Sequence, residues 1–304
     1  MTRRGWILFA ATALIWGIPY LFIKIAVAEI TPAALVFLRS VIGASLLLPL
    51  AVGRKDLAPL RPYWKWMLAY TFVEIAAPWF LLSDAERRIS SSLAGLLIAA
   101  SPSIAAVLAL LTGRRDRLDS RRVVGLVLGF GGVAALVGLD VRADDLGAIG
   151  QVVLVALCYA SGPMIIERKL ARLPSLGVVA ASLGITALMY APFALTQLPS
   201  TMPSASVLLA VAVLGVICTA LGFVVFFALI TEVGAPRATV ITYVNPAVAL
   251  ALGVALLGEP FTVGIAIGSV LIVLGSVLAT RRAAPPSPSM SLTEERVRRI
   301  QSSH

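Results

Sequence analysis

The sequence predicts an all-α integral membrane protein with ten transmembrane helices, arranged as two inverted five-helix repeats. Three observations lead to this fold class. The chain has 304 residues, of which 59% are hydrophobic and 13% are charged, whereas soluble domains are about 25% charged. Ten apolar stretches are long enough to cross a bilayer, which takes about 20 residues. Prolines and glycines also recur at an offset of 143–144 residues.

The ten apolar stretches are separated by short connections. The first follows Arg3 and Arg4 and begins as a signal peptide would, but it is too long for the apolar region of such a peptide and lacks a small-residue cleavage site. We therefore expect it to be a retained helix. The expected helices are 6–27, 33–52, 64–82, 90–111, 122–139, 147–166, 176–197, 206–230, 237–257 and 261–280.

The distribution of positive charge predicts the orientation in the membrane. If the N-terminus is cytoplasmic, twenty lysines and arginines fall in cytoplasmic segments, and only Arg87, Arg88 and Arg142 fall on the opposite side. Cytoplasmic loops of membrane proteins carry such an excess. The sequence thus predicts a multi-pass protein of the cytoplasmic (inner) membrane with both termini in the cytoplasm.

The repeat divides the chain into two halves, 1–140 and 141–282, followed by a cytoplasmic tail, 283–304. Because each half has five helices, the second half enters the membrane from the opposite side. Inverted repeats of this kind underlie many secondary transporters, which bind their solute near the midplane between the repeats. The landmarks that share the offset are Pro19 and Pro163, Pro49 and Pro192, Pro102 and Pro246, Gly125 and Gly268, and Gly132 and Gly275.

Pro102 and Pro246 are predicted to be hinges in the fourth helix of each half. Proline removes a helical hydrogen bond and bends the helix, and freed backbone groups at membrane depth are tolerated where they line a cavity or where neighbours satisfy them. Ser101 and Asn245 precede these prolines and are candidate solute-binding residues. The alternative is a packing kink with no role in ligand binding.

Small residues recur at helical spacing in the fifth helix of each half. Gly125 and Gly129 are four residues apart in one half, as are Gly264 and Gly268 in the other. This spacing lets helix backbones approach closely. It indicates packing within the chain or formation of a homodimer, and both remain open.

Three segments resemble the drug/metabolite transporter superfamily, and within it the EamA-like ten-helix group. They are ALIWGIPYLFIKIA, TPAALVFLRSVIGASLLLP and YVNPAVALALGVALLGEPFTVGIAIGSVLIVLGSVLA, and the resemblance covers about residues 6–280. It implies a ten-helix bundle, alternating access, and transport of small metabolites, often export of amino acids. The second half carries Gly258, Glu259 and Pro260, where the first half has TGRRDRLD. A role that requires this glutamate in both halves is therefore not supported.

Charged residues within membrane helices are expensive and are candidates for function. Glu74 lies near the middle of the third helix. It is either a proton-titrating or cation-binding group, or a neutral carboxyl group with a structural role. Arg39 lies in the second helix, where the resembled family has a basic residue. It is placed to pair with Glu74 or a solute carboxylate, or to extend to the membrane interface. Lys24 is expected to extend to the interface.

Aromatic and polar side chains complete the predicted solute-binding set. Several lie deeper than the membrane-interface positions at which Trp and Tyr are usually enriched. Rings with a few polar groups suit small amphipathic solutes. The full predicted set is Trp16, Tyr20, Arg39, Glu74, Trp79, Ser101, Tyr159, Ser161, Tyr243 and Asn245.

The same residues exclude several function classes. His304 is the only histidine, so no histidine metal site or triad is expected, and Cys158 and Cys218 lie in apolar runs. We expect no enzyme, no cofactor and no nucleic-acid partner. The expected partners are a small-molecule solute, membrane lipid and, as a candidate, a coupling proton. The sequence favours a secondary transporter that exports small metabolites such as amino acids. The alternative is a proton-coupled multidrug or organic-cation exporter that uses Glu74, although small multidrug exporters carry their glutamate in the first helix.

Overall fold

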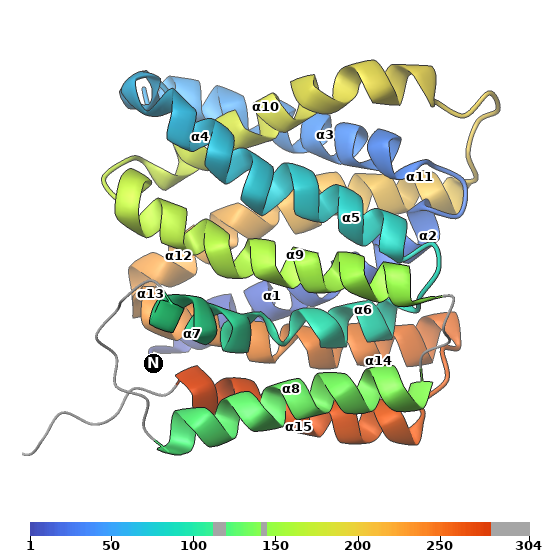
Figure 1. The fold of residues 1–304 in the computed structure, drawn as a ribbon. Helices are drawn as coiled ribbons and strands as arrows, with labels where there is room; N and C mark the ends of the chain where they lie inside the picture. Colours follow the sequence, from blue (N-terminus) through green and yellow to red (C-terminus); the bar gives the residue numbers. More distant parts are fainter. Residues whose placement is uncertain (112–119, 141–144, 281–304) are drawn as a thin grey trace, which may run out of the picture.

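The computed structural model describes residues 1–111, 120–140 and 145–280, and all regular structure in these ranges is helical (Figure 1). Arg142, part of the loop 112–122 and the tail 283–304 lie outside the described residues. The helices before residue 141 are α1 (Arg3–Gly17), α2 (Pro19–Ala26), α3 (Pro32–Gly53), α4 (Trp64–Thr71), α5 (Ala77–Ala85), α6 (Ser91–Ile98), α7 (Ser101–Leu111) and α8 (Ser120–Asp140). The later helices are α9 (Leu146–Ile165), α10 (Ser175–Thr196), α11 (Ala205–Ala212), α12 (Gly222–Val233), α13 (Ala235–Ala238), α14 (Asn245–Leu257) and α15 (Val263–Thr280).

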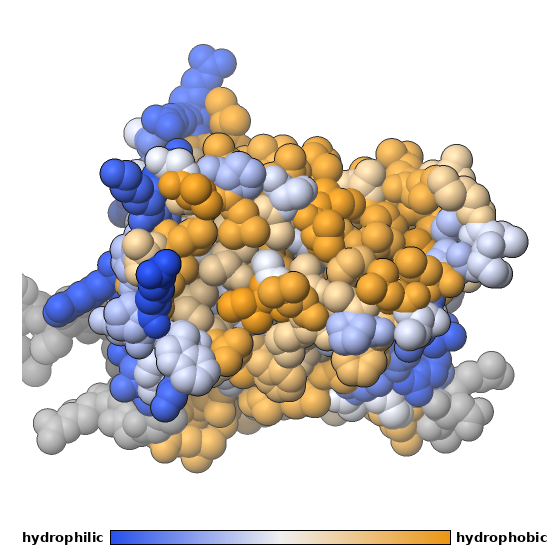
Figure 2. Space-filling model, turned by 90° about the horizontal axis from the view of Figure 1, so that it is seen from above, coloured by the Kyte–Doolittle hydropathy of each residue, from blue (hydrophilic) through white to orange (hydrophobic). Residues whose placement is uncertain are grey.

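The helices join into membrane-length segments, as the apolar pattern predicted. Nine helical segments in the described ranges have the length and hydropathy to span a bilayer, and Val263–Ala279 is a shorter apolar helix. Figure 2 shows an apolar surface between two hydrophilic edges. The prediction of a ten-helix, all-α membrane protein is confirmed.

Three of the segments are broken next to a proline. The first breaks at Ile18 before Pro19, and the fourth breaks between α6 and α7, just before Pro102. The ninth changes from the 3-10 helix η6 (Thr239–Tyr243) to α14, just before Pro246. The bends predicted at Pro102 and Pro246 are thus present, because these prolines cannot continue the preceding hydrogen-bond pattern.

Three other segments contain π-helical turns. One of them, η4 (Ile166–Leu170), follows α9, and the other two lie at corresponding places in the two halves. The π segment η2 (Phe72–Ala76) joins α4 to α5, and η5 (Val213–Leu221) joins α11 to α12. Adding the offset of 143–144 residues to the first range places it inside the second. Such turns interrupt the regular hydrogen-bond pattern and occur often at functional sites.

The main helix contacts join the first half of the chain to the second. α3 packs against α10, α6 against α14, α5 against α9, α1 against α12, and α8 against α15. The last pair lies side by side at one edge of the bundle (Figure 1). Small residues explain its closeness, because a Cβ added at Gly125 would lie 2.8 Å from the Gly275 carbonyl oxygen. The predicted glycine spacing therefore serves packing within the chain.

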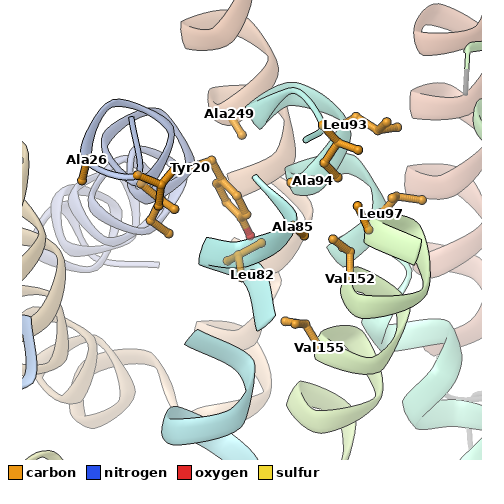
Figure 3. Close-up of a cluster of buried hydrophobic side chains, with 14 of the residues drawn as sticks. Tyr20, Ala26, Leu82, Ala85, Leu93, Ala94, Leu97, Val152, Val155 and Ala249 are labelled. Atoms are coloured by element: carbon orange, nitrogen blue, oxygen red, sulfur yellow. The ribbon is translucent and has the colours of Figure 1, made fainter. Parts of the chain in front are cut away.

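The largest buried cluster lies toward the end of the bundle where α2 and α5 end and α6 begins. We call this the Glu259 end, because the loop that contains Glu259 lies there. Figure 3 shows Tyr20, Leu82, Leu97 and Val152 of this cluster, on α2, α5, α6 and α9. By contrast, Ser103 is the only buried residue of α7. The helices of both halves are thus packed together at the Glu259 end.

Candidate functional site

Arg39 is a buried cation without a carboxylate partner in the described part of the chain. Its side chain extends from α3, and the residue is 8% exposed. Nε donates a hydrogen bond of 2.8 Å to Thr219 Oγ1, and Cζ lies 3.7 Å from the centroid of the Trp79 ring. No acidic oxygen of the described residues lies within ion-pair distance. Since a guanidinium has five N–H donors, most of its hydrogen-bonding capacity remains for a ligand.

Thr219 holds the guanidinium in place. Its hydroxyl accepts from Arg39 and donates at 2.7 Å to the carbonyl of Leu214, five residues earlier in η5. The π segment thereby fixes the orientation of Thr219, and Thr219 fixes Nε of Arg39. Trp79 covers the guanidinium from α5, in the cation–π arrangement that aromatic faces favour.

Two predicted tyrosines lie near this cation. Tyr20 and Tyr159 both interact electrostatically with Arg39. Tyr20 is buried in α2, and Tyr159 lies in α9. The structure therefore brings together four predicted residues, Tyr20, Arg39, Trp79 and Tyr159.

Glu74 is a further charged residue that interacts with Tyr159. Its carboxyl group packs against Gly162 of α9, where an added Cβ would lie 2.8 Å from Cδ. Oε2 is buried and has no hydrogen-bond partner among the described residues. Glu74 interacts electrostatically with Tyr159 and Cys158, but it forms no ion pair with Arg39 in the described structure. Tyr159 thus interacts with both a basic and an acidic side chain, and these two side chains form no ion pair with each other in the described structure.

The π segments η2 and η5 each accept a hydrogen bond from an aromatic side chain of the opposite half of the chain. Trp16 Nε1 donates to the carbonyl of Cys218 at 3.2 Å, and Tyr190 Oη donates to the carbonyl of Ala76 at 2.9 Å. Interrupting a helix frees backbone acceptors, which need partners inside a membrane. Trp16 is therefore a support of η5.

The remaining predicted residues make local contacts instead of meeting at Arg39. Ser101 Oγ donates to the carbonyl of Ile98, and Ser161 Oγ donates at 2.8 Å to Leu157. Tyr243 Oη donates at 3.2 Å to the backbone of α15. These three hydroxyl groups donate hydrogen bonds to backbone carbonyl groups of helices, as side-chain hydroxyls often do.

Asn245 and Pro246 begin α14, which packs against α6 and α1, and Pro102 lies at the start of α7. The hydrogen-bonding pattern assigns the amide orientation of Asn245, whose nitrogen donates to the carbonyls of Ala13 and Ile241 at 3.1 and 3.0 Å. Pro246 is buried and Pro102 is half-buried. The fourth and ninth segments thus pack on each other through α6 and α14.

Thr219, Gly162 and Tyr190 were missed by the sequence analysis. Thr219 was detectable in part, because the offset of 143–144 residues places the counterpart of Glu74 at 217–218, next to it. Gly162 and Tyr190 carry no comparable signal. A glycine and a tyrosine within apolar helices acquire these roles only when α9 and α10 meet η2.

The Gly-Glu-Pro motif connects α14 to the start of α6. Gly258 ends α14 with the left-handed angles φ 65° and ψ 25°, which glycine adopts readily. The turn directs Glu259 at Ser91 and Ser92, whose backbone N–H groups donate at 2.7 and 2.9 Å. Both serine hydroxyls donate to the same carboxylate. Burial raises the pKa of Glu259, but the hydrogen bonds from Ser92 and Ser91 outweigh burial and hold the pKa below its ordinary value.

A second carboxylate makes a similar contact at the same end. Glu29 accepts hydrogen bonds from Ser204 Oγ at 2.6 Å and from Ser204 N at 2.7 Å, just before α11 begins. These bonds, the hydroxyl first, lower the pKa of Glu29. Both acidic loops therefore cap a helix of the other half, because unpaired N–H groups at a helix start favour a negative charge.

Lys24 does not extend freely to the membrane interface. Its Nζ donates to the carbonyls of Glu86 and Ile89 at 2.6 and 2.8 Å, so it caps the end of α5. No group of three His, Cys, Asp or Glu side chains that could hold a metal occurs in the described ranges.

Two comparisons with sequences identify relatives over most of the chain. The model of the EamA-like transporter family matches residues 3–138 and 146–281. An uncharacterized transporter of Archaeoglobus fulgidus is 24% identical over 92% of this chain and 99% of its own length. The uncharacterized inner membrane transporter YedA of Escherichia coli K12 is 28% identical over 82% of this chain and 81% of its own.

A comparison with solved structures gives the same fold. One crystal structure covers 92% of this chain and 97% of its own chain, with a TM-score of 0.65 and 22% identity. Together with the two matched ranges, which span nearly all of the described helices, this likeness confirms the resemblance seen in the sequence. The protein is a multi-pass membrane transporter, not an enzyme, and it belongs to the EamA-like transporter family.

Proposed function

We propose that this transporter exports small zwitterionic metabolites, such as amino acids, across the cytoplasmic membrane. The observation that carries the proposal is the buried guanidinium of Arg39, which has no carboxylate partner in the described structure. Arginine binds carboxylates through two parallel hydrogen bonds. Glu74, which like Arg39 interacts with Tyr159, supplies an acidic group for an ammonium. A zwitterion would thus compensate both buried charges.

The proposed mechanism is alternating access between two inverted halves. Corresponding helices pack in pairs, with α3 on α10, α6 on α14, and α8 on α15. An odd number of helices in each half implies opposite orientations, and solutes of such transporters bind between the repeats. The positive-charge distribution supports an outward-facing Glu259 end and cytoplasmic termini. In this orientation the structure is packed shut toward the outside.

The alternative is a proton-coupled exporter of drugs or organic cations that uses Glu74 for proton–cation exchange. The buried charge of Arg39 disfavours it, because an organic cation would be repelled in a medium of low dielectric. Glu74 also lies in the third helix and not in the first. A homodimer is not part of the proposal, since the glycines considered for it pack α8 against α15.

The proposal is tested by counterflow in proteoliposomes with labelled amino acids and lipophilic cations. Arg39→Gln should weaken amino-acid transport about 10- to 100-fold, as expected when a charge-assisted hydrogen bond of about 1.5–3 kcal/mol is lost. The control is Arg88→Gln, because Arg88 is an exposed residue paired with Asp84. Preference for lipophilic cations, with Arg39→Gln unchanged or faster, would establish the alternative.

A further inference from the structure

Glu86 is a second buried carboxyl group, which the proposed solute site does not use. It directly follows the membrane-spanning segment that ends at Ala85, and it is 0% exposed. Both carboxyl oxygens lack a hydrogen-bond partner among the described residues. Burying an ionised carboxylate without donors is costly. The packed structure therefore favours the protonated form of Glu86.

Three titratable side chains from neighbouring elements interact electrostatically with Glu86. Tyr20 and Lys24 belong to α2, and Glu259 belongs to the loop after α14. The ammonium of Lys24 is bound to the backbone carbonyls of Glu86 and Ile89. Burial raises the pKa of Glu86 well above its ordinary value, Lys24 lowers it, and Glu259 raises it. The net effect is upward.

The arginines next to Glu86 do not neutralise it. Arg87 and Arg88 instead lie 3.7 and 3.2 Å from Asp84. Arg88 and Asp84 also hydrogen-bond to Gln151 of α9 at 2.7 and 2.9 Å. This exposed group ties α5 to α9 and leaves Glu86 on the buried side.

We propose that Glu86 is a proton-binding residue of the gate at the Glu259 end, which closes when Glu86 is protonated and opens when it ionises. We define the gate as the packed junction of α2, α5 and α6. The proposal rests on the alternating-access part of the proposed function, and it does not depend on which solute is carried. When the junction separates, water reaches the carboxylate, and Lys24 becomes free to serve as its counter-charge.

The direction of the pH effect follows from proton linkage. Closure raises the pKa of Glu86, so the closed form binds the proton more tightly than the open form does. Closure is therefore fully favoured below the pKa of the open form and weakens as the pH rises through the pKa of the closed form. Opening would also expose apolar residues beneath the gate, such as Leu93, which is 7% exposed here.

The test measures how fast a cysteine at Leu93 reacts with a hydrophilic maleimide at different pH values. The purified protein would carry Cys158→Ala, Cys218→Ala and Leu93→Cys, with no solute added. The rate is divided by that of Ser200→Cys in the same background, because Ser200 is exposed at the same end and its reaction corrects for thiol ionisation. We expect the ratio to rise with pH, by about tenfold for each unit that separates the two pKa values.

Substitutions of Glu86 decide whether this residue is responsible. Glu86→Gln should keep the ratio low and independent of pH, and Glu86→Met supplies a second uncharged side chain of similar size. Glu29→Gln is the matched control, because Glu29 is exposed at the same end, and it should retain the pH response. A flat ratio in the parent protein, or an unchanged response in Glu86→Gln and Glu86→Met, would overturn the gate proposal. Neither result bears on Arg39, which is tested by transport.

Discussion

Replacing Glu259 with glutamine should destabilise the protein through the contact between α14 and α6. The carboxylate accepts hydrogen bonds from the N–H groups and hydroxyls of Ser91 and Ser92. Glutamine keeps one acceptor oxygen and loses the charge. Hydrogen bonds to charged groups contribute about 1.5–3 kcal/mol and neutral ones about 0.5–1.5 kcal/mol. With a discount for the solvent screening of a half-exposed group, we expect a loss of about 1–2 kcal/mol.

Thermal unfolding in detergent measures this loss. A change of 1 kcal/mol lowers Tm by about 2–4 °C for 150–250 residues, so Glu259→Gln should lower Tm by about 2–8 °C at a fixed scan rate. The pKa of Glu259 is lowered, so its stabilisation is present above its ordinary pKa and disappears as the pH falls through the lowered value. The Tm difference should therefore shrink in acid. Equal Tm values at neutral pH, or a difference that grows in acid, would refute the capping role.

Two further predictions concern glycines with close neighbours. Gly162→Ala should slow transport at least about tenfold, because the new Cβ displaces Glu74. The control is Gly150→Ala on the same helix, whose Cβ meets nothing within 4 Å and which should transport normally. Equal transport rates of the two variants would remove Glu74 from the mechanism. Gly125→Leu should lower Tm, because overpacking costs about 1–3 kcal/mol of stability or more. The control is Gly131→Leu, since Gly131 has open space around it. Equal Tm values of the two variants would contradict close packing of α8 on α15.

The sequence predicted the helices and their breaks because both depend on local properties. Apolar length defines a membrane helix, and proline interrupts one wherever neighbours allow it. The bends next to Pro102 and Pro246 were therefore predictable. The π segments were not, since no residue type in Phe72–Ala76 distinguishes an i→i+5 turn from an ordinary helix. They depend on donors such as Trp16 and Tyr190, which arrive from distant segments.

The candidate site was predictable in its charges and less so in its geometry. Arg39 and Glu74 were identified because charge within a membrane helix is costly. Whether they pair with each other depends on side-chain positions, and the described structure contains no ion pair between them. Glu86 was assigned to a connection between helices, where a carboxylate is usually hydrated. It is buried because α2 and the loop after α14 cover the end of α5.

The pairing of helices between the two halves has a consequence for biosynthesis. At about 5–20 residues per second, the ribosome needs roughly 7–30 s to add the second half after the first is complete. During this interval α3 lacks α10, α8 lacks α15, and Arg39 lacks Thr219. Until the second half is inserted, the small-residue faces of the first half and the side chain of Arg39 thus lack the partners that cover them in the complete protein. Membrane chaperones and proteases would meet the nascent protein in this unfinished form.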